Sequence, residues 1–149
     1  MRFFLKIQVV VVAITFVLTP FSFISCQKER LDPEVYKAKE KLAVLGHDFS
    51  DEGFLKAIDS FDADLVKLYI EAGMGPDHKI KIGNTDVPVI FYALEKGNDL
   101  IAQLFIHKGS DINASVKGTT VLMKAVEKAN VETLTLMLKN KINVNLAGN

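Results

Sequence analysis

The chain has 149 residues, and its 18 lysines and arginines are balanced by 18 aspartates and glutamates, so the formal net charge at pH 7 is zero. This length allows one modest domain, and the balanced charge lacks the summed positive field that nucleic acid requires, so no nucleic-acid partner is expected. A single cysteine, Cys26, excludes a disulfide within the chain.

Residues 1–25 are predicted to be a signal peptide. Arg2 and Lys6 flank the start of an uncharged stretch, residues 7–27, and its apolar centre IQVVVVAITFVL has the length of a signal-peptide core. Pro20 then interrupts the apolar run, because proline breaks a helix.

The sequence FSFISCQKE around Cys26 resembles the lipobox of bacterial lipoproteins. Ser25 fits this pattern, whereas Phe23 stands where leucine is usual. The resemblance implies that Cys26 becomes a lipid-modified mature N-terminus, followed by a tether at residues 26–32, in an outer-membrane lipoprotein that faces the periplasm or the cell surface. Two alternatives stay open: cleavage by the ordinary signal peptidase, and an uncleaved N-terminal signal anchor in the inner membrane.

Residues 33–49 are predicted to form an N-terminal capping helix or a degenerate repeat. Asp32 and Pro33 supply a helix start and Gly46 a stop, which places a helix at residues 33–45. The pattern at residues 45–49 resembles the tail of the repeats that follow.

Residues 50–149 contain three copies of one pattern. Residues 92–113 match residues 124–145 at an offset of 32 and residues 56–77 at an offset of 36. The four extra residues fall in a connection with the glycine, asparagine, aspartate and proline of a turn, where an insertion is tolerated. Such a period is typical of repeat proteins.

Each copy is predicted to hold two short helices. In the middle copy they span residues 89–96 and 99–108, with Asp99 as the cap of the second helix and Gly109 as its end. Helices this short are marginal alone, so each must bury an apolar stripe against the neighbouring copy. The predicted stripes are Leu65, Val66, Leu68 and Tyr69, then Leu100, Ile101, Leu104 and Phe105, then Val131, Leu134, Met137 and Leu138.

The three copies resemble the ankyrin repeat. The third opens with GTTVLMKAVEKAN, which matches the family pattern at Gly118, Thr120, Leu122 and Ala125, and the middle copy closes with KGSDIN. The family's TPLH tetrad is replaced by PVIF, TVLM and EGFL, and Lys141 replaces a helix-stopping glycine. The resemblance implies an all-α, ankyrin-repeat α-solenoid of about three helix-turn-helix repeats behind the capping helix. At the far end, helix 131–140 either caps itself or is covered by something else.

No enzymatic activity, cofactor, metal or small-molecule substrate is expected. His47, His78 and His107 lack partner ligands at helical spacing with a third ligand in view. The chain also lacks a nucleophile elbow and a phosphate-binding glycine loop.

The family resemblance implies a protein partner, bound by the tips of extended hairpins and by the exposed side of the first helix in each repeat. The candidate partner-binding residues are Asp59, Ser60, Thr85, Val87, Glu95, Lys96, Val116, Lys117, Thr119, Glu127 and Lys128. The charged pairs among them can equally form a solvated face.

The expected function is that of a non-enzymatic protein–protein interaction scaffold, lipid-anchored in the bacterial cell envelope. Two alternatives remain: a structural or regulatory accessory that protects a neighbouring envelope enzyme, and a surface adhesin. Charge reversal at Glu95, Lys96, Glu127 and Lys128 abolishes partner capture only under the first interpretation.

Overall fold

The computed structural model describes residues 32–146. The chain divides into two units, Met1–Pro33 and Glu34–Asn149, and the second unit contains all three repeats. The predicted signal peptide, Cys26 and all of the tether except Asp32 lie outside the described residues. Within those residues, no helix is both long and apolar enough to span a bilayer.

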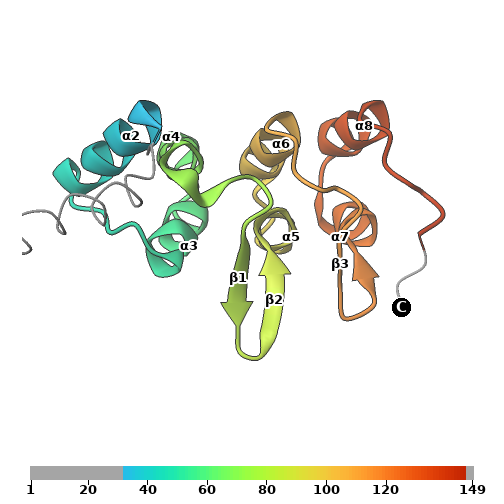
Figure 1. Cartoon of the computed structure of the whole chain (residues 1–149). Coiled ribbons are helices and arrows are strands. Elements are labelled where there is room, and N and C mark those ends of the chain that lie inside the picture. The colour runs from blue at the N-terminus through green and yellow to red at the C-terminus, as the bar shows by residue number, and fades with distance from the viewer. Residues whose placement is uncertain (1–31, 147–149) are drawn as a thin grey trace, which may run out of the picture. The chain divides into compact units, whose positions relative to one another are not determined.

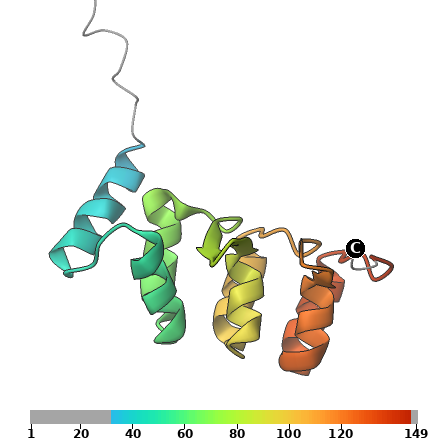
Figure 2. The same cartoon turned by 90° about the horizontal axis from the view of Figure 1, so that it is seen from below.

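The second unit is a row of antiparallel helix pairs. Helix α2 (Pro33–Val44) comes first, and the pairs are α3 (Asp51–Asp59) with α4 (Ala63–Tyr69), α5 (Val89–Glu95) with α6 (Asp99–His107), and α7 (Val121–Lys128) with α8 (Val131–Lys139). A π-helical turn, η1 (Ile70–Met74), continues α4. Figure 1 shows α4, α6 and α8 in one row and α3, α5 and α7 in another, and Figure 2 shows the same arrangement from below. The predicted all-α solenoid is confirmed.

Short polar side chains start most of these helices by accepting a hydrogen bond from a backbone N–H of the first turn. The caps of α3, α4, α6, α7 and α8 are Ser50, Asp62, Asn98, Thr120 and Asn130. The prediction that Asp99 caps α6 is therefore wrong by one residue. Asp99 instead accepts hydrogen bonds from Thr133 Oγ1 at 2.9 Å and from the backbone N–H of Asn130 at 3.2 Å, and so joins two helix pairs.

Residues with positive φ end the second helix of each pair, and in the first pair this residue is Gly73, with φ of 110° in the turn that continues α4. Gly109 follows α6 with φ of 86°, as predicted, and Lys141 follows α8 with φ of 60°. The backbone N–H of Lys141 donates to the carbonyl of Leu138 at 3.2 Å, and that of Ile142 donates to the carbonyl of Met137 at 3.3 Å. Lys141 thus adopts the conformation of the glycine it replaces, at the cost that a Cβ carries there.

Two antiparallel hairpins connect the pairs. The first joins β1 (Lys79–Ile82) to β2 (Thr85–Pro88), and the second joins β3 (Ser115–Val116) to β4 (Thr119–Thr120). The strands have four residues each in the first hairpin and two each in the second. This difference accounts for the four extra residues of the first repeat, and their predicted position in the connection is correct.

The core runs continuously through the pairs. Its largest fully buried side chains include Phe54, Tyr69, Ile90, Phe105 and Met137. Three residues of the predicted apolar stripes do not join it, because Leu100, Val131 and Leu138 are exposed. Ala102 and Ile106 are buried on α6 instead, so the buried face of α6 is rotated away from Leu100.

Candidate functional site

A hollow of about 700 Å³ lies where the first hairpin meets α3 and α5. We call it the hairpin groove, and its lining residues are Leu55, Lys81, Ile82, Gly83, Tyr92, Glu95 and Lys96. The hairpin supplies one wall and the two helices supply the other. The groove therefore spans the junction between the first and second repeats.

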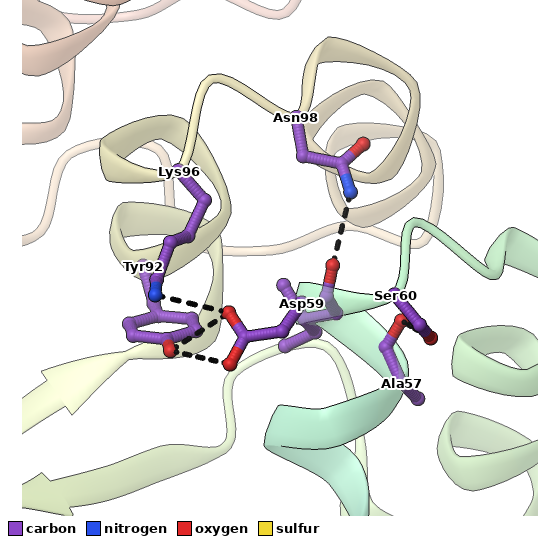
Figure 3. A network of polar contacts seen from close by, with 7 residues as sticks. Ala57, Asp59, Ser60, Tyr92, Lys96 and Asn98 are labelled. Carbon is purple, nitrogen blue, oxygen red and sulfur yellow. Dashed lines mark hydrogen bonds and ion pairs between the residues drawn. The ribbon is translucent and has the colours of Figure 1, made fainter.

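Asp59, Tyr92 and Lys96 form a polar network beside this groove (Figure 3). The Tyr92 hydroxyl donates to Asp59 Oδ1 at 2.9 Å and also approaches Oδ2 at 3.1 Å. Lys96 Nζ lies 3.1 Å from Asp59 Oδ1 and 5.0 Å from the centre of the Tyr92 ring. The network fixes two groove residues and ties α5 to the end of α3.

The helical period explains how this network forms. Tyr92 and Lys96 are four residues apart at the end of α5, so their side chains share one face of the helix. Asp59 is the last residue of α3, which places its carboxylate at the start of the inter-helix turn. One carboxylate thus serves two side chains of the next repeat.

Burial, hydrogen bonding and charge together set the protonation of the network. Burial raises the pKa of Tyr92, and the neighbouring Asp59 carboxylate also raises it, whereas Lys96 acts in the opposite direction. Hydrogen bonding to Tyr92 and then to Asp59 raises the pKa of Lys96. At neutral pH the tyrosine is neutral and the lysine is charged.

The apolar part of the groove comes from the alternation of strand β1. Ile80 is buried at the base of the hairpin against Val87, and Ile82 lies two residues further along the same side of the strand. Ile82 is exposed and lines the groove, together with the half-buried Leu55 of α3. A partner side chain that covered Ile82 would extend the existing core.

The predicted residues of the first two repeats fall in and around the groove. Glu95 and Lys96 line it, and Asp59 holds the network beside it. Ser60 Oγ donates to the carbonyl of Ala57 at 3.0 Å, which makes it part of the helix end. Thr85 is half-buried and pairs with Ile82 across the hairpin.

Val87 does not belong to an accessible surface. It is only 5% exposed and pairs with the buried Ile80 in the hairpin. Its position in a hairpin suggested a contact with a partner, but strand alternation turns its side chain inward. Val87 is therefore a core residue.

The remaining predicted residues gather at the third repeat. Val116, Lys117 and Thr119 lie in the second hairpin, and Lys117 occupies its turn with φ of 47°. On α7, Glu127 pairs with Lys124 at 3.1 Å and with Lys128 at 3.8 Å. No residue of this group lines the hairpin groove.

Five residues that line the hairpin groove were not predicted from the sequence. These are Leu55, Lys81, Ile82, Gly83 and Tyr92. The signals were present: Ile80 and Ile82 alternate along one strand, and Tyr92 stands one helical turn before Lys96. What the sequence could not supply was the distance between the hairpin and α3.

A second, smaller hollow of about 380 Å³ lies near the start of α3, with Gly53, Lys56 and Tyr69 among its lining residues. The Tyr69 hydroxyl donates to the carbonyl of Asp48 at 2.8 Å, which locks the loop before α3 onto α4. In the part of the chain that the structure describes, no three His, Cys, Asp or Glu side chains are grouped as a metal site.

Comparison with known protein families adds one match. The family model of ankyrin repeats, in three copies, matches residues 54–147, which is more than half of the chain. The searches of curated proteins and of solved structures found no match.

Proposed function

Because the chain belongs to the ankyrin-repeat family, we propose that it is a non-enzymatic scaffold that captures another protein and is lipid-anchored in the bacterial cell envelope. Ankyrin repeats are protein–protein interaction modules, which gives the coarse function. The position of the partner-binding site and the lipid anchor are our additions to this coarse function.

The hairpin groove is the observation that carries the partner-binding site. It combines exposed apolar surface on Ile82 with a network-held aromatic ring, Tyr92, and a charged rim at Glu95 and Lys81. Protein interfaces typically combine an apolar centre, enriched in aromatic residues, with a polar rim. A partner that inserts one apolar side chain beside Ile82 fits this chemistry.

The envelope anchor rests on the N-terminal sequence. Arg2 and Lys6, the apolar stretch after them, and Ser25 before the only cysteine agree with a lipoprotein signal. Two or three acyl chains on Cys26 would hold the protein stably on a membrane, since each buried methylene contributes about 0.8 kcal/mol. We place the mature protein at the outer membrane, with an inner-membrane signal anchor as the alternative.

Site-specific photo-crosslinking in cells tests the groove. A photoreactive amino acid at Ile82 is expected to crosslink a partner, and the same amino acid at Leu100, which is exposed on α6, is the matched control. When Glu95→Lys is added to the chain that carries the photoreactive amino acid at position 82, the yield of the crosslinked product should fall, because the charge of the groove rim is reversed. Crosslinks of equal yield from both positions, or from neither, would reject the groove as the binding site.

Lys96 is unsuitable for the charge-reversal test because it also holds two repeats together. Lys96→Glu would place a second carboxylate beside Asp59 and weaken the junction between repeats, so a loss of binding there has two causes. Glu95, Glu127 and Lys128 avoid that junction. If reversal of these three leaves partner capture intact, the accessory and adhesin alternatives gain support over the scaffold.

Intact-mass measurement of membrane-purified protein tests the anchor. A mature chain that begins at Cys26 and carries two or three acyl groups is expected, and Cys26→Ser should lose both features. An unprocessed chain in the membrane would replace the lipid anchor with a signal anchor.

A further inference from the structure

Three apolar positions that are buried in the α5–α6 pair are exposed in the α7–α8 pair. Phe91, Leu94 and Ile106 are 5%, 1% and 3% exposed, and their counterparts 32 residues later are 47%, 66% and 61% exposed: Met123, Val126 and Leu138. The side chains at these three positions are apolar in both pairs, but in the α7–α8 pair no described residue buries them. This pattern is typical of a surface that is buried in an assembly.

Hydrogen bonds show which way this surface faces. On α6, Asp99 and Gln103 point to the following pair, because Thr133 bonds to Asp99 at 2.9 Å and to Gln103 at 3.0 Å. Their counterparts on α8 are Val131 and Thr135. The face of α8 that carries Val131, Thr135 and Leu138 is therefore the one that a following pair would cover.

We call Met123, Val126, Val131, Thr135 and Leu138 the terminal face. Val131 replaces the polar Asp99 of the preceding pair and is 79% exposed, so this face is more apolar than the equivalent face inside the row. Figure 1 shows α7 and α8 side by side as the last pair of the row.

We infer that the terminal face binds the same face of a second copy of this chain about a two-fold axis. In such an interface each surface patch meets itself. If α8 packs antiparallel on α8 of the partner subunit, Val131 of one chain meets Leu138 of the other, and the reverse contact forms at the other end. Both apolar residues are then covered.

The same axis also serves α7. If α7 also packs antiparallel on α7 of the partner subunit, Met123 of one chain meets Val126 of the other, and the two-fold axis crosses α7 midway between these residues. In the same way, the axis crosses α8 midway between Val131 and Leu138. These two midpoints lie equally far along the chain from the turn that joins the helices. Since α7 and α8 are antiparallel, one axis passes through both midpoints, and both helices pair at once.

The charges beside the terminal face select the second copy as the occupant. Glu132 and Lys139 are seven residues apart on α8, so they lie on the same flank, near opposite ends of the helix. Antiparallel pairing brings Glu132 of each chain near Lys139 of the other. The surface is thus self-complementary in charge as well as in apolar contact.

Sedimentation equilibrium of the full chain, solubilised in a density-matched detergent, tests this interface. The wild-type chain is expected to dimerise. Glu132→Lys alone and Lys139→Glu alone should each raise the dimer Kd roughly tenfold, because two attractive contacts become repulsive. The double variant Glu132→Lys/Lys139→Glu should restore the wild-type Kd. Both residues are exposed, so these changes leave the fold intact.

A second pair of variants tests the apolar part. Leu138→Asp should abolish the dimer, whereas Leu100→Asp should not, although both leucines are exposed on the second helix of a pair. Circular dichroism checks that each variant folds. A monomer at all concentrations would overturn the inference. So would a dimer that survives the single charge reversals, or a double variant that does not recover.

Discussion

The side-chain amide of Asn98 donates a hydrogen bond to the backbone carbonyl of Ile58 at 3.1 Å, across the junction between the first two helix pairs. The oxygen of the same amide accepts from the backbone N–H of Ile101 and caps α6. Asn98 is buried, so water cannot replace either bond if the side chain is removed. One residue thus begins a helix and joins two repeats.

Asn98→Ala is expected to lower the free energy of unfolding by about 2–3 kcal/mol, since it removes a helix cap and leaves the Ile58 carbonyl unsatisfied in the interior. Asn130→Ala, which removes an exposed cap from α8, should cost only about 1 kcal/mol. Urea denaturation measures both. Equal losses would mean that the bond to Ile58 contributes nothing.

Gly53→Ala should destabilise the protein, although alanine favours a helix over glycine. A Cβ at this position would overlap the Tyr69 hydroxyl and would lie 2.6 Å from the carbonyl oxygen of Asp48. Overpacking of this kind costs about 1–3 kcal/mol. Thermal unfolding of Gly53→Ala, with Glu52→Ala as the control in the same turn, measures the effect. A gain in stability would show that the loop at Asp48 moves freely.

Lys141→Gly should stabilise the protein by about 0.5–1 kcal/mol, because glycine adopts the left-handed conformation of this position without the cost that a Cβ brings. Lys56→Gly is the opposite control, since it places glycine inside α3 and should destabilise by about 1 kcal/mol. Both changes remove one positive charge. If the two variants shift the urea midpoint in the same direction, charge rather than backbone conformation is responsible.

Stability should fall in alkaline solution through Tyr92 and Lys96. Both have a pKa raised by the folded structure, so their contribution is complete below the ordinary pKa values near 10 and is lost as pH rises through the folded values. Tyr92→Phe removes the tyrosine part and should flatten the decline above pH about 10. Denaturation at a series of pH values measures the slope, and an unchanged slope in the variant would contradict this origin.

Much of the fold was predictable because the repeat is visible in the sequence. The offsets of 32 and 36 residues placed the helix pairs and the longer connection correctly. The cap of α6 was misplaced because Asn98 and Asp99 are adjacent and both are good cap residues, and only the neighbouring pair decides between them. Leu100 was assigned to the core because its spacing fits a helix, but α6 turns that side outward.

The candidate site was less predictable. Glu95 and Lys96 were identified from a resemblance, and they do line the hairpin groove. Ile82 was not, because its exposure depends on how far the hairpin extends past the helices. Val87 was assigned to the surface for a different reason: position in a hairpin does not reveal which side of a strand meets the core.

The first hairpin exceeds the second by two residues in each strand. An even increment leaves the facing of every existing side chain unchanged, because strand side chains alternate with a period of two. Ile80 and Val87 therefore keep their places against the helices while the tip advances. The height of the groove wall can vary in such steps without repacking the interior, so this hairpin is the natural element to lengthen or shorten when the specificity of the scaffold is to be redesigned.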